Sequence, residues 1–269
     1  MIFSHNICFD LPNTLSPLIE AAPELVHNLQ PLKKPNDDAF RSKAKVLCLI
    51  AKAVVDILHV TGVECALFGS LACYLYGNTR SPNDIDLVAS SCLHERMDAE
   101  RLKRVVVDRD PEHFCLGAPK DPSATYRILY FVVDQVLAPA NTFHKNRCKI
   151  DILVPGLLHL PSLTGKNVRW RGELPVVPFS VLLLQKLQGW DDHLHMKEPY
   201  KFIKHKTDAE DIRALLALEH VVSLRFAQPW EDRALFSPEF MALSRWRIAD
   251  FCREYPETEP EWRRIGFKN

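Results

Sequence analysis

Cys65-Ala66-Leu67-Phe68-Gly69-Ser70, followed after thirteen residues by Asp84-Ile85-Asp86-Leu87-Val88, is the stretch that decides the fold. The short apolar run before Gly69 predicts a buried strand, and the Gly-Ser pair predicts a tight turn that ends it. Leu71 to Tyr76 then predicts a short helix, and the second quoted segment predicts another strand. A strand, a turn, a helix and an acidic strand therefore follow one another.

The acidic strand carries a carboxylate at alternate positions. Side chains at i and i+2 of a strand point to the same face, so Asp84 and Asp86 present two carboxylates with Cα atoms roughly 7 Å apart. Two neighbouring carboxylates repel each other, and Mg²⁺ typically takes one or two carboxylates plus substrate phosphates as ligands. The pair predicts a metal site, although these two residues alone leave open that the strand has no role in metal binding.

Three further features lie close to this pair in the predicted fold. The Gly69-Ser70 turn opens a helix, where backbone N–H groups and a hydroxyl can bind phosphate, or where Ser70 can simply cap the helix. Arg80 lies four residues before Asp84, within reach of the same phosphates. Asp151 stands alone in an apolar strand, where its charge needs a metal or a partner such as Lys149 or Arg147.

The order of these motifs resembles the nucleotidyltransferase superfamily of the DNA polymerase beta type, over roughly residues 45 to 215. The resemblance implies an α+β fold, with a mixed sheet flanked by helices and followed by a helical domain. It implies that Gly69 and Ser70 hold a triphosphate, and that Asp84 and Asp86 bind two Mg²⁺ or Mn²⁺ ions. It also implies that Asp151 binds the catalytic metal and activates the attacking hydroxyl. Two metals about 4 Å apart suit in-line attack on an α-phosphate.

The C-terminal half adds candidate nucleotide-binding residues. Lys186 lies in an apolar helical stretch, where its amine either reaches the nucleotide or extends to solvent. Lys206 to Asp211 resembles the Arg-Asp-x-x-Asp motif of abortive-infection nucleotidyltransferase-like toxins, which have a lysine on the preceding helix. Thr207 stands at the arginine position, so Lys206 is the substitute. Asp208 and Asp211 then orient Lys186 or Lys206, or they are first-turn acids of a helix that Thr207 caps.

The remaining elements follow from periodicity and turn residues. We expect an N-terminal arm over 1–40 with a short helix near 21–29, an α/β domain over 41–178 and a helical domain over 179–269. Other predicted helices cover 43–60, 95–107, 181–190, 208–217 and 238–255, and other predicted strands cover 126–133 and 149–154. A polar loop is predicted over 108–123, a hairpin or loop over 169–173 and a short extended piece over 174–178.

Composition limits the class of protein. Lysine plus arginine and aspartate plus glutamate number 34 each, so no overall field attracts a polyanion. The eight cysteines contain no C-x-x-C pair and are expected to be reduced core thiols. We expect no signal peptide and no membrane helix, and therefore a cytoplasmic or nuclear protein. The C-terminal tail interleaves tryptophan with arginine, which predicts either a small helical core or stacking on single-stranded RNA.

The predicted function is transfer of a nucleoside monophosphate from an NTP, ATP by default, to a hydroxyl of a small molecule, protein or RNA. Neutral overall charge disfavours a long polyanion such as RNA. The alternative is a nucleotide-binding regulatory or interaction protein of the same fold that lacks turnover. The donor nucleotide and the acceptor do not follow from the sequence.

Overall fold

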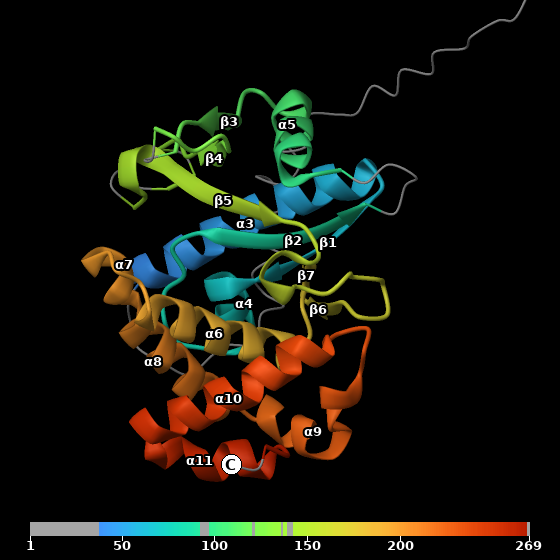
Figure 1. Cartoon of the computed structure of the whole chain (residues 1–269). Coiled ribbons are helices and arrows are strands. Elements are labelled where there is room, and N and C mark those ends of the chain that lie inside the picture. Colours follow the sequence, from blue (N-terminus) through green and yellow to red (C-terminus); the bar gives the residue numbers. More distant parts are fainter. Residues whose placement is uncertain (1–37, 92–96, 120–121, 136, 139–141, 268–269) are drawn as a thin grey trace, which may run out of the picture.

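The computed structural model describes residues 38–91, 97–119, 122–135, 137–138 and 142–267. The predicted arm therefore lies almost entirely outside the described residues, as does the short helix expected near 21–29. The structure combines helices with one mixed sheet and is α+β, as the sequence predicts (Figure 1).

The sheet has seven strands in the order β3-β4-β5-β2-β1-β7-β6. Their bounds are β1 Val63–Phe68, β2 Ile85–Ser91, β3 Phe114–Gly117, β4 Ile128–Val132, β5 Arg147–Leu153, β6 Arg169–Arg171 and β7 Leu174–Val176. β2 pairs with β5 and β1 pairs with β7 in parallel, whereas the other neighbours are antiparallel. The mixed sheet that the sequence resemblance implies is confirmed.

Strand register brings the predicted site residues together. In the antiparallel pair of β1 and β2, Phe68 lies opposite Asp86. In the parallel pair of β2 and β5, Asp86 lies beside Asp151. Residues that are far apart in the chain thus meet on three adjacent strands, at the point where β1 ends and the Gly69-Ser70 turn begins.

Helices cover the sheet and secure its central strands. α3 Asp38–Val60 contacts β1, β7 and α5 Ala99–Arg109, while α5 also contacts β3 and β5. α4 Gly69–Tyr76 continues directly from β1 and packs against β1, β2 and the first helix of the C-terminal half. α4 ends at Gly77, whose φ of 116° provides the left-handed conformation that commonly stops a helix.

The C-terminal helices gather along one side of the sheet (Figure 1). They are α6 Phe179–Leu194, α7 Pro199–Phe202, α8 Lys204–Leu216, α9 His220–Ala227, α10 Pro238–Glu254 and α11 Glu259–Arg264. α6 packs against both α8 and α10, and the Trp190 ring meets Phe251 edge-on with 5.0 Å between centroids. The buried apolar side chains of both halves form one continuous cluster.

Trp230 and Trp262 are buried, so these two tail tryptophans form a small helical core, which was one of the two expected arrangements. Trp246 is 51% exposed. The six cysteines in the described ranges are all free thiols, and five are buried, in agreement with the sequence interpretation. Within the described residues, no helix is both long and apolar enough to cross a bilayer.

Several predicted boundaries were wrong. The expected polar loop over 108–123 contains β3, and α7, α9 and α11 were not predicted. α8 begins at Lys204, so Thr207 lies inside the helix and is not its cap. The helix expected from residue 95 begins at Ala99, because the Asp98 side chain accepts a hydrogen bond from the Arg101 backbone and caps it.

Trp190→Ala tests whether the α6 and α10 contact stabilises the whole chain. Removing this buried ring should lower the free energy of unfolding by about 3–5 kcal/mol, because it leaves a cavity in the core. Trp246→Ala removes the same side chain from an exposed position and should change it by less than about 0.5 kcal/mol. Urea unfolding measures both values, and equal effects would contradict the packing described.

Candidate active site

Gly69 lies against the acidic strand more closely than any other residue type could. Its φ is 66°, in the left-handed region, and a Cβ added there would lie 2.8 Å from Cγ of Asp86 and overlap a carboxylate oxygen. Glycine is therefore required both by backbone conformation and by space. The turn after β1 forms a cradle that presents its backbone directly to the Asp86 carboxylate.

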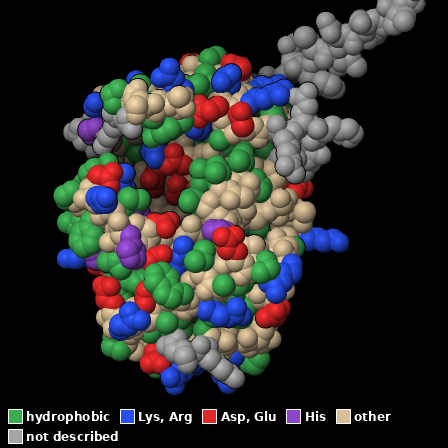
Figure 2. All heavy atoms as spheres, in the orientation of Figure 1, with side chains coloured by type: hydrophobic (Ala, Val, Ile, Leu, Met, Phe, Trp, Pro, Cys, Tyr) green, Lys and Arg blue, Asp and Glu red, His purple; other side chains and the backbone are tan. Residues whose placement is uncertain are grey.

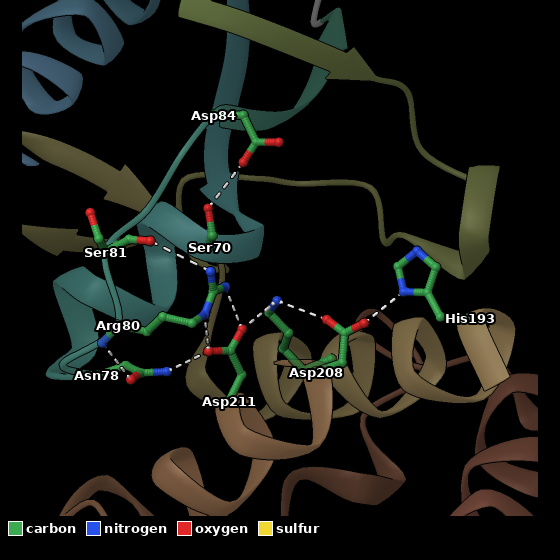
Figure 3. A network of polar contacts seen from close by, with 9 residues as sticks. Ser70, Asn78, Arg80, Ser81, Asp84, His193, Asp208 and Asp211 are labelled. Atoms are coloured by element: carbon green, nitrogen blue, oxygen red, sulfur yellow. Dashed lines mark hydrogen bonds and ion pairs between the residues drawn. The ribbon is translucent and has the colours of Figure 1, made fainter. Parts of the chain in front are cut away.

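Ser70 connects the same turn to Asp84, which directly precedes β2 and so lies outside the strand that was predicted to contain it. Its hydroxyl donates a hydrogen bond to Oδ1 of Asp84 at 3.1 Å (Figure 3), and the serine is buried. The residue that precedes α4 is Phe68, which makes no side-chain cap, so the expected alternative of Ser70 as the helix cap is wrong. The Gly-Ser turn thus contacts both carboxylates of the acidic strand.

The three acids lie close enough to repel one another. Burial, followed by the charges of Asp84 and Asp151, raises the pKa of Asp86 to about 8, against the opposing effect of Lys186 and Lys149. Among the described residues, none forms a hydrogen bond or ion pair with Asp86. Its charge therefore lacks a direct counter-ion from this part of the protein.

Asp151 is positioned differently from the other two acids. It forms an ion pair with Lys149, two residues earlier on the same strand, and its side chain is 33% exposed. In the described ranges, no three or more His, Cys, Asp or Glu side chains lie close enough together to hold a metal ion by themselves. Asp84 and Asp86 still suit Mg²⁺, because that ion uses one or two protein carboxylates and completes its shell with phosphates and water.

A network of charges joins the loop that follows α4 to α6 and α8, below Asp84 in Figure 3. Arg80 donates from Nε and Nη2 to the two oxygens of Asp211, both at 2.6 Å, and Asn78 donates to the same carboxylate at 2.9 Å. Lys186 forms ion pairs with Asp211 at 2.8 Å and with Asp208 at 3.3 Å. Asp211 is thus bound by three donors, which satisfies a carboxylate that is only 1% exposed.

The network also shows how these charges are tuned. Burial disfavours the charged form of Asp211, but the hydrogen bond from Arg80 and the charges of Lys186 and Arg80 outweigh burial and lower the pKa of Asp211. Burial likewise opposes protonation of Lys186, yet nearby Asp211 and Asp208 help to raise its pKa, so it stays cationic. On the other side of Asp208, Nδ1 of His193 lies 2.6 Å from Oδ2.

The positions of the predicted basic residues differ from one another. The Lys186 side chain is 11% exposed and does not extend to solvent, and both acids of the Asp-x-x-Asp segment orient it, as one interpretation expected. Asp208 and Asp211 lie beyond the first turn of α8, so the first-turn interpretation is wrong. Arg80 binds Asp211. Lys206 is exposed on α8, and no contact joins it to the network within the described residues.

Sequence reasoning missed Asn78 and His193. Asn78 follows the glycine that ends α4, and His193 lies seven residues after Lys186 on α6. His193 could have been found from the sequence only by its spacing from Lys186, because residues seven apart lie on the same face of a helix.

A cavity of about 160 Å³ lies beside Asp86 and Gly69, and Lys186 of α6 also lines it. Its wall is formed by Phe68, Leu158, Leu182, Gln185, Lys186, Gln188, Gly189, Asp192 and Asp208. Figure 2 shows a hollow on this face of the molecule, with acidic side chains at its bottom and basic side chains at its edge. A polar ligand in this cavity would contact Asp86, Gly69 and Lys186 at once.

No protein-family model and no curated protein sequence matches the chain. The crystal structure of an antigenic nucleotidyltransferase-like protein from Paracoccidioides brasiliensis does match its fold. The alignment covers 83% of this chain and 93% of that one, at 14% sequence identity and a TM-score of 0.52. The chain has a nucleotidyltransferase-like fold.

Two other solved structures are more distant. JHP933 from Helicobacter pylori aligns over 81% of this chain and 97% of its own, at 14% identity and a TM-score of 0.37. Cid1 in complex with the UTP analog UMPNPP aligns over 70% of this chain and 50% of its own, at 13% identity and a TM-score of 0.28. At these TM-scores neither structure adds to the assignment of the nucleotidyltransferase-like fold.

Gly69→Ala tests the contact between the turn and Asp86. Alanine at a left-handed position costs about 1–2 kcal/mol of unfolding free energy, and here the Asp86 carboxylate must also move. Gly156→Ala is the matched control, because Gly156 has a φ of 92° but a Cβ there meets nothing within 4 Å. We expect the larger loss for Gly69→Ala in urea unfolding. Equal losses would show that Asp86 does not constrain the turn.

Asp211→Asn tests the buried network. Leaving Arg80 and Lys186 without their shared carboxylate should lower the free energy of unfolding by about 3 kcal/mol at neutral pH. Because the pKa of Asp211 is lowered in the folded state, its stabilisation is present above the ordinary value of 3.8 and is lost as pH falls through the folded-state value. The difference between wild type and variant should therefore shrink in acid.

The control for Asp211→Asn is Glu210→Gln, which neutralises an exposed carboxylate on the same helix. It should change the free energy of unfolding by less than about 0.5 kcal/mol at any pH. A difference between wild type and Asp211→Asn that stays constant into acid would contradict the charged network.

Proposed function

We propose that the protein is a divalent-metal-dependent nucleotidyltransferase, which moves a nucleoside monophosphate from an NTP to an acceptor hydroxyl. The observation that carries this proposal is the placement of Asp86 against Gly69, with Asp84 and Asp151 beside it and no direct counter-ion among the described residues. A carboxylate that is buried and repelled by its neighbours favours binding of a cation. The Gly69-Ser70 turn beside it opens α4, and the start of a helix favours binding of a phosphate.

Asp84 and Asp86 would hold the metal ions, and Mg²⁺ there would neutralise charge on the transferring phosphate. The other residues of the site would hold the NTP in position. Gly69 and Ser70 stand at the start of α4, and their backbone N–H groups would bind the triphosphate. Lys186 lines the cavity with its amine held by Asp208 and Asp211, and would bind the phosphates from the opposite wall.

In this proposal the acceptor hydroxyl oxygen attacks the α-phosphorus, the bond to the β-phosphate breaks and pyrophosphate leaves. Asp151 lies on the strand next to Asp86 and would take the hydroxyl proton once Lys149 turns away. Arg80 is bound by Asp211, so we assign it to positioning Lys186 through that acid. The proposed contact of Lys206 with nucleotide rests on the sequence resemblance alone.

ATP is the default donor in this proposal, and the acceptor class stays open between a small molecule, a protein and RNA. One observation favours a second candidate function, a nucleotide-binding protein without turnover. The ion pair between Lys149 and Asp151 occupies the carboxylate that would otherwise accept the proton. Binding of a nucleotide in the cavity would not require that carboxylate, whereas transfer would.

Asp86→Asn separates these functions when NTP turnover is followed with radiolabelled nucleotide and candidate acceptors. Loss of the central carboxylate should reduce pyrophosphate release by about 100-fold or more, because the metal loses its ligand. Glu64→Gln neutralises an acid at the far end of β1 and should leave the rate unchanged. Wild type that releases no pyrophosphate with any NTP, yet binds one, would favour the second function.

Asp151→Ala tests the third carboxylate separately. Turnover should fall by about 100-fold or more, while affinity for the NTP changes little, because Asp151 is assigned to proton transfer and not to the triphosphate. Nucleotide binding is measured as the rise in melting temperature with NTP and Mg²⁺. Full activity in this variant would show that the assignment of Asp151 is wrong.

A further inference from the structure

Asp208 on α8 is shared between two residues of α6. Its Oδ1 lies 3.3 Å from Nζ of Lys186, and its Oδ2 lies 2.6 Å from Nδ1 of His193 (Figure 3). A carboxylate oxygen accepts, so Nδ1 of the histidine is the donor in this contact. Lys186 and His193 lie on one face of the helix, about two turns apart. One carboxylate of α8 thus bridges both residues.

The ammonium group of Lys186 has three N–H donors, and two of them face acids. Nζ lies 2.8 Å from Asp211 and 3.3 Å from Asp208. Because Lys186 also lines the cavity beside Asp86, the third donor is available to a ligand there. Two acids fixed in place therefore orient the ammonium group, whereas one acid alone would leave it free to rotate.

Asp208 also lines this cavity, and its charge has the same sign as that of a phosphate. The lysine engages Oδ1, and the hydrogen bond from His193 engages Oδ2. Without the imidazole, Oδ2 would lose this donor, and the carboxylate could repel an anion more strongly or turn towards Lys186 and occupy its amine. Either change would weaken binding of an anion in the cavity.

His193 lies at the outer end of this network. Its side chain is 27% exposed, compared with 12% for Asp208 and 11% for Lys186. It is not one of the residues that line the cavity in the described part of the chain. A substitution at His193 therefore removes the hydrogen bond to Asp208 without removing a contact to the ligand and without opening a hole in the core.

We propose that His193 is a positioning residue for the triphosphate of the donor nucleotide, because it holds Asp208 in the orientation that directs Lys186 into the cavity. This inference rests on the proposed nucleotidyl transfer, in which Lys186 binds the phosphates. The ring holds Asp208, the two acids orient the lysine, and the lysine donates to a phosphate oxygen. The contribution of His193 is therefore to affinity for the nucleotide and not to the chemical step.

His193→Ala tests the proposal in the full-length chain with Mg²⁺. Dissociation constants for ATP and for inorganic triphosphate, measured by calorimetry, should both rise by about tenfold, which is a typical coupling within one hydrogen-bonded network. The KM for ATP should rise by a similar factor, while kcat changes by less than about threefold. A fall in kcat without a change in KM or in the dissociation constants would contradict the proposal.

His195→Ala is the matched control. It removes the same ring two residues later, directly after α6, where Nδ1 lies 3.2 Å from Oδ1 of Asp191. This side chain also contacts an acid, but it is 64% exposed and its partner is not Asp208. Both dissociation constants should therefore stay at their wild-type values. An equal loss of binding in the two alanine variants would show that the effect is not specific to His193.

Two amide variants separate the hydrogen bond from the bulk of the ring. The side-chain nitrogen of asparagine can occupy nearly the position of Nδ1, so His193→Asn keeps a donor to Asp208 and should bind triphosphate within about threefold of wild type. His193→Gln carries its nitrogen one carbon further out, near the position of Nε2, and should bind as weakly as His193→Ala. This pair decides the question even if His193→Ala does not fold. Equal binding by both amide variants would overturn the proposal.

A double variant tests whether His193 acts through Asp208. In the Asp208→Asn background the carboxylate that the imidazole holds is absent, so adding His193→Ala should change the dissociation constant for inorganic triphosphate by less than about twofold. A loss of about tenfold in both backgrounds would show that His193 acts by another route, and the proposed positioning through Asp208 would be wrong.

The outcomes separate this inference from the proposed function. If wild type and His193→Ala bind ATP and inorganic triphosphate equally tightly, the role of His193 is overturned and nucleotidyl transfer still stands. If neither inorganic triphosphate nor any NTP binds to wild type in the presence of Mg²⁺, both proposals are wrong.

Discussion

Electrostatic repulsion at Asp86 is the constraint around which the rest of the structure is arranged. Strand pairing holds this carboxylate beside Asp151, and local chain direction holds it near Asp84, although like charges at this spacing disfavour ionisation. The sheet maintains the arrangement because the strands that carry these acids lie at its centre and bury apolar side chains on alternate positions. Burial of the core side chains therefore offsets the repulsion between these carboxylates and keeps them close together.

The charges of the helical half balance one another, in contrast to those of the acidic strand. Asp211 receives hydrogen bonds from two residues of the loop between α4 and β2 and an ion pair from α6, so one carboxylate ties the halves together. The same acid keeps Lys186 charged within a buried site. The cavity is thus lined both by Asp86, which has no hydrogen bond or ion pair within the described residues, and by Lys186, which two acids hold in place.

Local pattern was enough to predict the acidic strand and the Gly-Ser turn, because alternation in a strand and the conformational freedom of glycine are short-range properties. It was not enough for Arg80, whose partner Asp211 lies 131 residues further along the chain. The position four residues before Asp84 suggested a phosphate ligand, but the side chain turns to the helical half. β3 escaped prediction because its four residues gain their stability from pairing with β4, which a polar loop sequence does not reveal.

The segment between the two predicted domains, at Val177, is hydrogen-bonded to the sheet and to α4. Val177 donates its backbone N–H to the carbonyl of Leu67 at 2.9 Å, and its own carbonyl accepts a hydrogen bond from the Tyr76 hydroxyl at 2.7 Å. α6 then begins at Phe179, within a core shared by both halves. A hinge needs residues free to change their backbone angles, and these are fixed to the sheet. A rotation of one half against the other at Val177 would therefore first have to break both of these hydrogen bonds.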